Sequence, residues 1–373
     1  MTGLPKQRGG EPRLDVVFSE AWRNLVTGTS RGLLLALAFF CFCGGTAVAQ
    51  SRIVVDFTNQ ALAFRASGAA IWVISQPGGI NGQQCDNLAA APGILAAGAI
   101  RPGPPLALAV LPSGPINSWQ VTPGFTRLLN PSGPPNASGV WLASDLADRA
   151  VVLSSTTSLG LTDGTNMAVA GVYDWPTDGR LPILAYSIVA PVTSTQPYDQ
   201  CWVLAWPQPE QATQVLSLPL LPTVTGAGVT PAAPTSAQLN QTLGTRFDGP
   251  ARFASLPILP LELACIVVAT ILGFASIRLR RLELAANLHL GVARSTINLQ
   301  VLIETTIWAL LAALPASAVC LFAAKLGNTA NCWAALYPGI RSLVLAIIGA
   351  ALGALISAVL TRENHLFHYF KQR

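Results

Sequence analysis

The chain has 373 residues, of which 51% are hydrophobic and 10% are charged, and its mean hydropathy is +0.48. This composition excludes an ordinary soluble domain and indicates a membrane protein. The net charge of +5 comes largely from basic residues beside the apolar segments, so it does not imply a nucleic-acid partner.

The first apolar segment, 32–50, is long enough for a transmembrane helix. It follows residues 1–31, in which the run LDVVFSEAWRNLV predicts an amphipathic cytoplasmic helix. An alternative interpretation is a signal peptide, because Ala47-Val48-Ala49 resembles a signal-peptidase site. A retained helix is favoured, since a region of 31 residues precedes the apolar run.

Three further apolar segments predict transmembrane helices, and they are 256–277, 299–324 and 342–361. Basic residues clearly outnumber acidic ones in 1–31, in the loop 278–298 and in the tail 362–373. The positive-inside rule therefore places both termini and the 278–298 loop in the cytoplasm. On this topology 51–255 is a large extracytoplasmic domain, and 325–341 is a second extracytoplasmic loop.

Residues 51–255 alternate short apolar runs with proline- and glycine-rich turn signals, which is typical of strands joined by tight turns. Helices are expected within 85–99 and 235–255, and the stretch 51–75 fits either a helix or a strand. The predicted fold class is thus a polytopic α-helical membrane protein with four transmembrane helices. A large α+β extracytoplasmic domain lies between helices 1 and 2.

The cysteines agree with this topology. Cys85 and Cys201 lie in the extracytoplasmic domain, where the compartment is oxidising, and we predict a disulfide between them. Cys332 in the second outer loop is a thiol that could compete for the pairing. No cysteine or histidine spacing indicates a metal site.

No catalytic residues are predicted. All three histidines lie in segments placed in the cytoplasm, so the outer domain has none for a Ser-His-Asp triad or a histidine-ligated zinc. The sequence contains no G-x-x-x-x-G-K-[ST] phosphate loop, so this chain has no ATP site of that kind. We therefore expect a protein that is not itself an enzyme.

The stretch RRLELAANLHLGVAR, residues 280–294, is unusually polar for this chain. On a helix, Leu284, Leu288 and Val292 form one apolar stripe, and Gly291 is a natural end for the helix. Such a stripe has three possible neighbours, which are the lipid interface, the protein's own helices and a groove on a partner.

The layout resembles a MacB/FtsX-type ABC transporter permease, also called the type VII or mechanotransmission class. That family has one helix, a large outer domain and three further helices, with a short cytoplasmic loop after the second. Its loop pattern is matched here by Arg280-Arg281, Glu283, Gly291 and Glu304. The resemblance covers both membrane ends and does not extend to residues 60–250.

The resemblance implies that the loop is a coupling helix that docks on an ATPase subunit, with Arg294 completing the set. ATP and Mg would be bound by that separate subunit, and a second permease copy or a related permease would complete the complex. An extracytoplasmic protein or lipoprotein is an expected substrate, in a bacterial cytoplasmic (inner) membrane. Glu304 is costly in hydrocarbon, so we expect it at the cytoplasmic interface near Arg294 or Arg281.

Two features bear on the membrane helices themselves. Gly349 and Gly353 are four residues apart, which permits close helix packing, although small residues could equally face lipid. The third span contains Pro315 in place of the family's glycine-rich sequence, and the tail lacks the family's usual proline-containing pattern.

The leading functional interpretation is a permease that couples ATP hydrolysis in a partner to motion of the outer domain, driving export or extraction of a substrate. One alternative is an FtsX-like signalling subunit that activates a cell-wall hydrolase. Another is a membrane-anchored structural or adhesion protein without an ATPase.

Overall fold

The computed structural model describes residues 31–130, 138–149, 158–193, 195–207, 215–222 and 233–361, together with Ser19 and Arg23. It divides into two compact units. The helical unit comprises Met1–Asn59 and Arg252–Arg373, and the sheet unit comprises Gln60–Ala251. The predicted N-terminal amphipathic helix and the cytoplasmic tail lie outside the described residues, apart from the few positions named above.

Within the residues that the structure describes, four helical runs are long and apolar enough to cross a membrane. These indicate a membrane-embedded protein. The runs are Gly32–Ala66, Gly249–Arg278, Arg294–Lys325 and Cys332–Leu360. The first is made of α2 (Gly32–Phe39), a π-helical turn (Phe40–Gly44) and α3 (Gly45–Ala66); the second is made of α8 (Gly249–Ser255) and α9 (Ile258–Arg278); the third is α11 (Arg294–Lys325) and the fourth α12 (Cys332–Leu360).

These bounds resolve two questions about the chain between the helices. The stretch after residue 50, which fitted either a helix or a strand, continues as helix to Ala66. The loop between the third and fourth runs is shorter than predicted, because α12 already begins at Cys332. Asn331 caps that helix, and its side chain accepts a hydrogen bond from the Trp333 amide at 3.0 Å.

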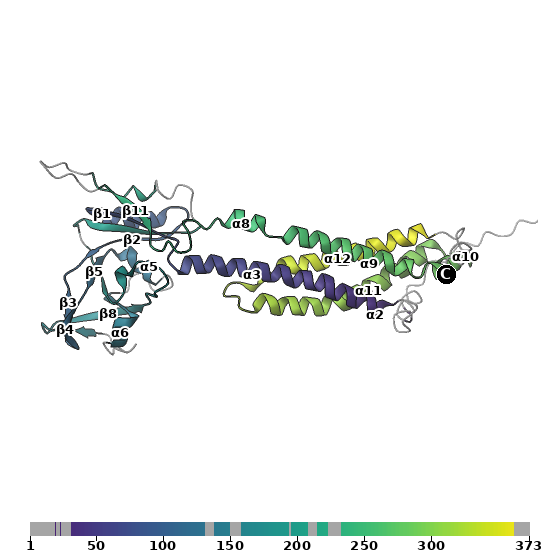
Figure 1. Ribbon diagram of the computed structural model, residues 1–373, viewed down its shortest axis with the longest axis horizontal. Helices are drawn as coiled ribbons and strands as arrows, with labels where there is room; N and C mark the ends of the chain where they lie inside the picture. The colour runs from purple at the N-terminus through teal and green to yellow at the C-terminus, as the bar shows by residue number, and fades with distance from the viewer. Residues whose placement is uncertain are drawn as a thin grey trace, which may run out of the picture. The chain divides into compact units, whose positions relative to one another are not determined.

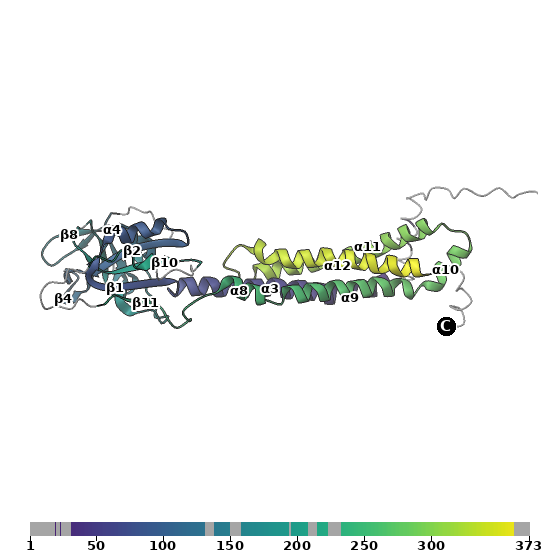
Figure 2. The ribbon, with the colours of Figure 1, turned by 90° about the horizontal axis from the view of Figure 1, so that it is seen from above.

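The helices pack with small residues inside and large apolar residues outside. In Figures 1 and 2, α12 runs along α9 and α11, and these pairs are in contact. Alanines and glycines of α12 are buried in these contacts, whereas its Val344, Ile348, Leu352 and Ile356 are exposed at every fourth position. A soluble protein would bury such residues, so this outer surface is suited to lipid.

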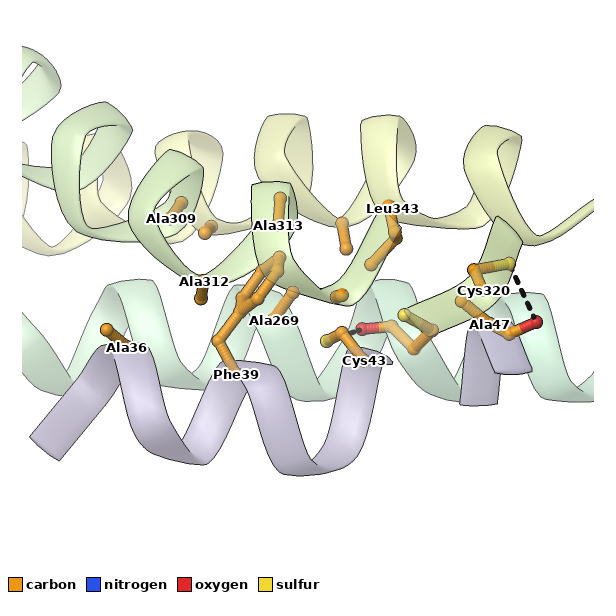
Figure 3. Close-up of a cluster of buried hydrophobic side chains, with 14 of the residues drawn as sticks. Ala36, Phe39, Cys43, Ala47, Ala269, Ala309, Ala312, Ala313, Cys320 and Leu343 are labelled. Atoms are coloured by element: carbon orange, nitrogen blue, oxygen red, sulfur yellow. Dashed lines mark hydrogen bonds between the residues drawn. The ribbon is translucent and has the colours of Figure 1, made fainter. Parts of the chain in front are cut away.

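Figure 3 shows the interior of the helical unit, where alanine and cysteine side chains fill the narrow space between the helices. Phe39 (Figure 3) and Trp308 are large exceptions, and their rings meet edge-on with centroids 6.0 Å apart. The Cys320 thiol donates to the carbonyl oxygen of Ala47 at 3.7 Å. These thiols therefore act as small apolar side chains that satisfy their weak polarity on the backbone.

Gly349 and Gly353 lie against α9 in the structure. A Cβ atom on Gly353 would collide with the carbonyl oxygen of Thr270, and one on Gly273 of α9 would collide with that of Ala350. The two helix backbones are thus in direct contact, which only glycine at these positions allows.

We expect Gly353→Ala to lower the free energy of unfolding by about 1–3 kcal/mol, because α9 and α12 must separate to make room for the methyl group. Gly45→Ala is the matched control, since within the described residues no atom lies within 4 Å of its Cβ position. This helical position should lose nothing and gain up to about 1 kcal/mol from helix propensity. Thermal or denaturant unfolding in detergent measures both, and equal stability of the two variants would contradict this packing.

The sheet unit confirms an α+β region between the first and second helical runs. Its main sheet has nine strands in the order β11-β1-β10-β2-β5-β9-β6-β8-β7. The pairs β5–β9 and β6–β8 are parallel and the others antiparallel, so the sheet is mixed. The strands are β1 (Ile71–Ile80), β2 (Ile94–Pro102), β5 (Ser118–Val121), β6 (Val140–Ala143), β7 (Ser158–Gly160), β8 (Asn166–Tyr173), β9 (Ile188–Pro191), β10 (Tyr198–Ala205) and β11 (Thr235–Gln238).

Shorter elements complete this unit, and several of their labels can be followed in Figure 1. A separate pair of strands, β3 and β4, forms a second small sheet. The elements are β3 (Leu106–Leu108), β4 (Leu111–Ile116), α4 (Gly82–Asn87), α5 (Thr126–Leu129), α6 (Ser144–Arg149) and 3-10 turns at Leu88–Ala90, Pro123–Phe125 and Pro182–Leu184.

The two stretches expected to hold helices in this unit are mostly not helical. In 85–99, α4 ends at Asn87 and β2 begins at Ile94, because Pro92-Gly93 interrupts the helix and Gly93 has a φ of +79°. In 235–255 the chain begins as β11, which pairs with β1 at the sheet edge, and only Gly249–Ser255 is helical. Long-range strand pairing overrides local helix preference in both places.

Cys85 and Cys201 form the predicted disulfide, with an S–S distance of 1.99 Å. Cys85 lies on α4 and Cys201 on β10, so the bond ties a helix onto the central strands of the sheet. Both are buried in a core with Ile74, Ile80 and Tyr198. Cys332, the possible competitor, is a free thiol of intermediate exposure.

Candidate docking surface around α10

The segment between α9 and α11 folds into a short helix, α10 (Arg281–His289), at one end of the helical unit (Figures 1 and 2). The helix ends where Gly291 adopts a φ of +89°, a left-handed conformation that favours glycine. The Val292 amide then donates to the carbonyl of Asn287 at 3.1 Å, which closes the turn. Ala293 is extended, and α11 begins at Arg294.

One buried guanidinium joins α10 to α11. Arg280 donates to both carboxylate oxygens of Glu283, at 3.0 and 2.7 Å, and to Glu304 Oε2 at 2.5 Å. The side chains of Arg280 and Glu304 are only 8% and 7% exposed, whereas Glu283 is half exposed. Gln300 donates to the second oxygen of Glu304 at 3.2 Å. We call Arg280, Glu283 and Glu304 the ion cluster.

Arg280 stays protonated in the ion cluster. Burial disfavours the guanidinium, but its hydrogen bond to Glu283 and the nearby charge of Glu304 outweigh that effect, so the pKa of Arg280 lies above its usual value. Glu304 was expected near Arg294 or Arg281, and the structure pairs it with Arg280. The turn between α9 and α10 brings Arg280 back against α11, and the sequence spacing did not reveal this.

The apolar stripe of α10 faces the protein's own helices. Leu284 is 4% exposed and packs with Ile277, Ile297, Val301, Ala354 and Ala358 of α9, α11 and α12. Leu288 packs on the same cluster and is partly buried. Of the three possible neighbours of the stripe, the protein's own helices α9, α11 and α12 therefore contact Leu284 and Leu288, and a role of these two residues in coupling to an ATPase stays a prediction.

Two exposed apolar residues lie in the turn after α10. Leu290 is 81% exposed and Val292 39% exposed, and both flank the exposed Gly291. His289 and Arg294 on either side are exposed as well, while Arg281 is half buried on the first turn of α10. We call His289, Leu290, Gly291 and Val292 the α10 tip. An isolated exposed leucine is ordinary, but here it sits on a rigidly closed turn.

A second ion pair, which was not predicted from the sequence, joins α9 to α12. Arg341 donates to both oxygens of Glu262, at 2.9 and 2.5 Å, and Glu262 is buried. Arg341 also lies over the Tyr337 ring, 5.8 Å from its centroid. Part of the signal was present, because Glu262 is the lone charge within the predicted span 256–277, and such charges usually pair. Its partner Arg341 was predicted to lie in the loop 325–341.

Within the part of the chain that the structure describes, no group of three or more histidine, cysteine or acidic side chains could hold a metal ion. Comparison of the sequence with models of known protein families and with curated proteins finds no match.

Proposed function

We propose that this chain is the permease subunit of an ABC transporter of the MacB/FtsX-like class. It would couple ATP hydrolysis by a separate ATPase subunit to motion of the sheet unit, driving export or extraction of a substrate. The observation that carries the proposal is the α10 tip, an exposed apolar turn on a helix fixed from behind by the ion cluster and by Leu284.

A docking element must transmit force as well as bind. Because Arg280 ties the start of α10 to Glu304, and Leu284 packs against α12, a displacement of α10 would be passed directly to α11 and α12. The helical run Gly32–Ala66 begins in the helical unit and ends in the sheet unit without interruption. In this proposal, motion of the first span would be transmitted to the sheet unit through this helical run.

In this proposal the protein spans a bacterial cytoplasmic membrane with both termini and α10 in the cytoplasm. The sheet unit lies outside, which agrees with its disulfide, because such bonds persist in oxidising compartments. The ATPase subunit would bind ATP and Mg, and a second copy of this chain or a related permease would complete the transporter.

We expect Leu290→Asp to weaken association with the ATPase by at least about tenfold, because it places a charge at the most exposed apolar position of the α10 tip. Leu243→Asp is the matched control, since Leu243 is an exposed leucine of the sheet unit and its substitution should change nothing. The measurement is ATP hydrolysis by the complex purified from native membranes. Absence of an ATPase from the wild-type complex, or equal retention by the two variants, would contradict the proposal.

A further inference from the structure

A pocket of about 480 Å³ lies within the sheet unit, where the end of α3 meets α5 and the loop after β8. That volume is in the range of small-molecule sites. Its floor is the β1–β10 pair, in which Ile71 and Leu204 lie opposite each other. The apolar lining consists of Leu62, Ile71, Leu128, Leu129, Pro176 and Leu204.

One wall of the pocket is a rigid aromatic ring. The Trp175 indole donates to the carbonyl of Leu181 at 3.1 Å, and its ring packs near Trp202 with centroids 6.2 Å apart. The guanidinium of Arg180 lies over the same indole, 5.0 Å from the centroid. Trp175 is therefore held in place before any ligand arrives, which lowers the entropic cost of binding.

Arg180 stabilises the pocket wall, and Asp178 neutralises its charge. It donates to Asp178 at 2.9 and 2.7 Å and to the carbonyl of Ala66 at the end of α3 at 2.8 Å. The hydrogen bond to Arg180 holds the pKa of Asp178 below its usual value, so this pair stays ionised. A ligand gains little from Arg180.

Two other charges line the pocket without such partners. The side chains of Arg65, in the last turn of α3, and of Asp174, in the loop after β8, make no hydrogen bond or ion pair with any residue that the structure describes. Here one cation and one anion stay separate at the rim of a mostly apolar space.

We propose that this pocket binds a small zwitterion with an apolar body, namely a short apolar peptide with free termini. Its carboxylate would meet the planar fork of Arg65 and its ammonium would meet Asp174, while its side chains fill the apolar space against Trp175. The balanced charge of the lining disfavours a purely anionic ligand. The proposal rests on the pocket alone and does not depend on the proposed transport function.

Calorimetric titration of the full chain in lipid nanodiscs with trileucine tests this assignment, with empty nanodiscs as background. We expect saturable binding that weakens about tenfold when the peptide is N-acetylated and about tenfold when it is C-amidated, since each cap removes one charge-assisted hydrogen bond. Because the capped peptides are compared on the wild-type protein, this test does not depend on whether the variants fold.

The variants then assign each terminus to its partner. Arg65→Gln should abolish the preference for the free acid over the amide and retain the preference for the free amine. Asp174→Asn should do the reverse. Arg127→Gln is the matched control, because Arg127 is an exposed arginine of α5 outside the lining. Neither Arg65 nor Asp174 is buried, so the midpoint of thermal unfolding should stay unchanged.

Three results would overturn the proposal. They are the absence of saturable binding at millimolar trileucine, equal binding of free and capped peptides, and preferences that survive in both Arg65→Gln and Asp174→Asn. Decanoate, an anionic amphiphile without an ammonium, is the competing probe. If decanoate bound as well as trileucine, the pocket would be a site for anions and the zwitterion assignment would be wrong.

Discussion

Arg280→Ala should lower the free energy of unfolding of the helical unit by about 3–5 kcal/mol, because it removes the buried guanidinium that hydrogen-bonds both Glu304 and Glu283. The side chain that remains is 7% exposed, so water cannot replace the lost hydrogen bonds at low cost. Unfolding in detergent, followed by denaturant titration, measures the loss.

A double variant separates the loss of the ion pair from simple loss of side-chain volume. Arg280→Met combined with Glu304→Leu removes both buried charges and should recover most of the stability, since a buried ion pair can often be replaced by apolar residues. Arg294→Ala is the control, because Arg294 is exposed and its substitution should cost under about 1 kcal/mol. If Arg280→Ala matched this control, the ion cluster would not be what fixes α10.

The same variant bears on the proposed function. With Arg280 replaced, α10 keeps its apolar contact through Leu284 but loses its ion pair with Glu304 of α11. In the proposed transporter, the ATPase would still bind the α10 tip, while its hydrolysis would no longer respond to the state of the sheet unit. Leu290→Asp should instead reduce binding itself, so the two variants distinguish docking from transmission.

The positions of the long apolar helices were largely predictable from the sequence. Which residues pack against each helix was not. Apolar length alone locates both ends of α9 and α11 and the end of α12 to within about five residues, because the hydrocarbon core requires spans of about this length. The start of α12, at Cys332, lies well before the predicted residue 342. The same periodicity shows that Leu284 and Leu288 share a face of α10. It cannot say what covers that face, because lipid, a partner groove and the chain's own helices are all apolar.

In the sheet unit, the α+β class and the disulfide partners followed from the sequence, and the strand pairing did not. Composition and turn signals indicate short strands, but β11 becomes a strand only because β1 offers a free edge more than 150 residues earlier in the chain. The pocket beside Trp175 is a similar case. Arg65 and Asp174 are far apart in sequence, and no local pattern indicates that both line one space.

Loss of the Cys85–Cys201 disulfide should destabilise the sheet unit by about 2–5 kcal/mol. The bond links residues 116 positions apart, so its removal frees a long loop in the unfolded chain. Cys85→Ala with Cys201→Ala should show this loss in the unfolding of the full chain, followed by tryptophan fluorescence, to which the buried Trp202 of the sheet unit contributes. Cys332→Ala, which removes a free thiol, is the control and should leave the transition unchanged.

The same bond tests on which side of the membrane the sheet unit lies. If it faces an oxidising compartment, mass spectrometry of protein from native membranes, alkylated without reduction, should find Cys85 linked to Cys201 and Cys332 alkylated. Reduction should then lower the unfolding midpoint of the wild-type protein and leave that of the double variant unchanged. Alkylated Cys85 and Cys201 in unreduced membranes would place the sheet unit among reducing conditions, and this would contradict the proposed orientation together with the docking of an ATPase on α10.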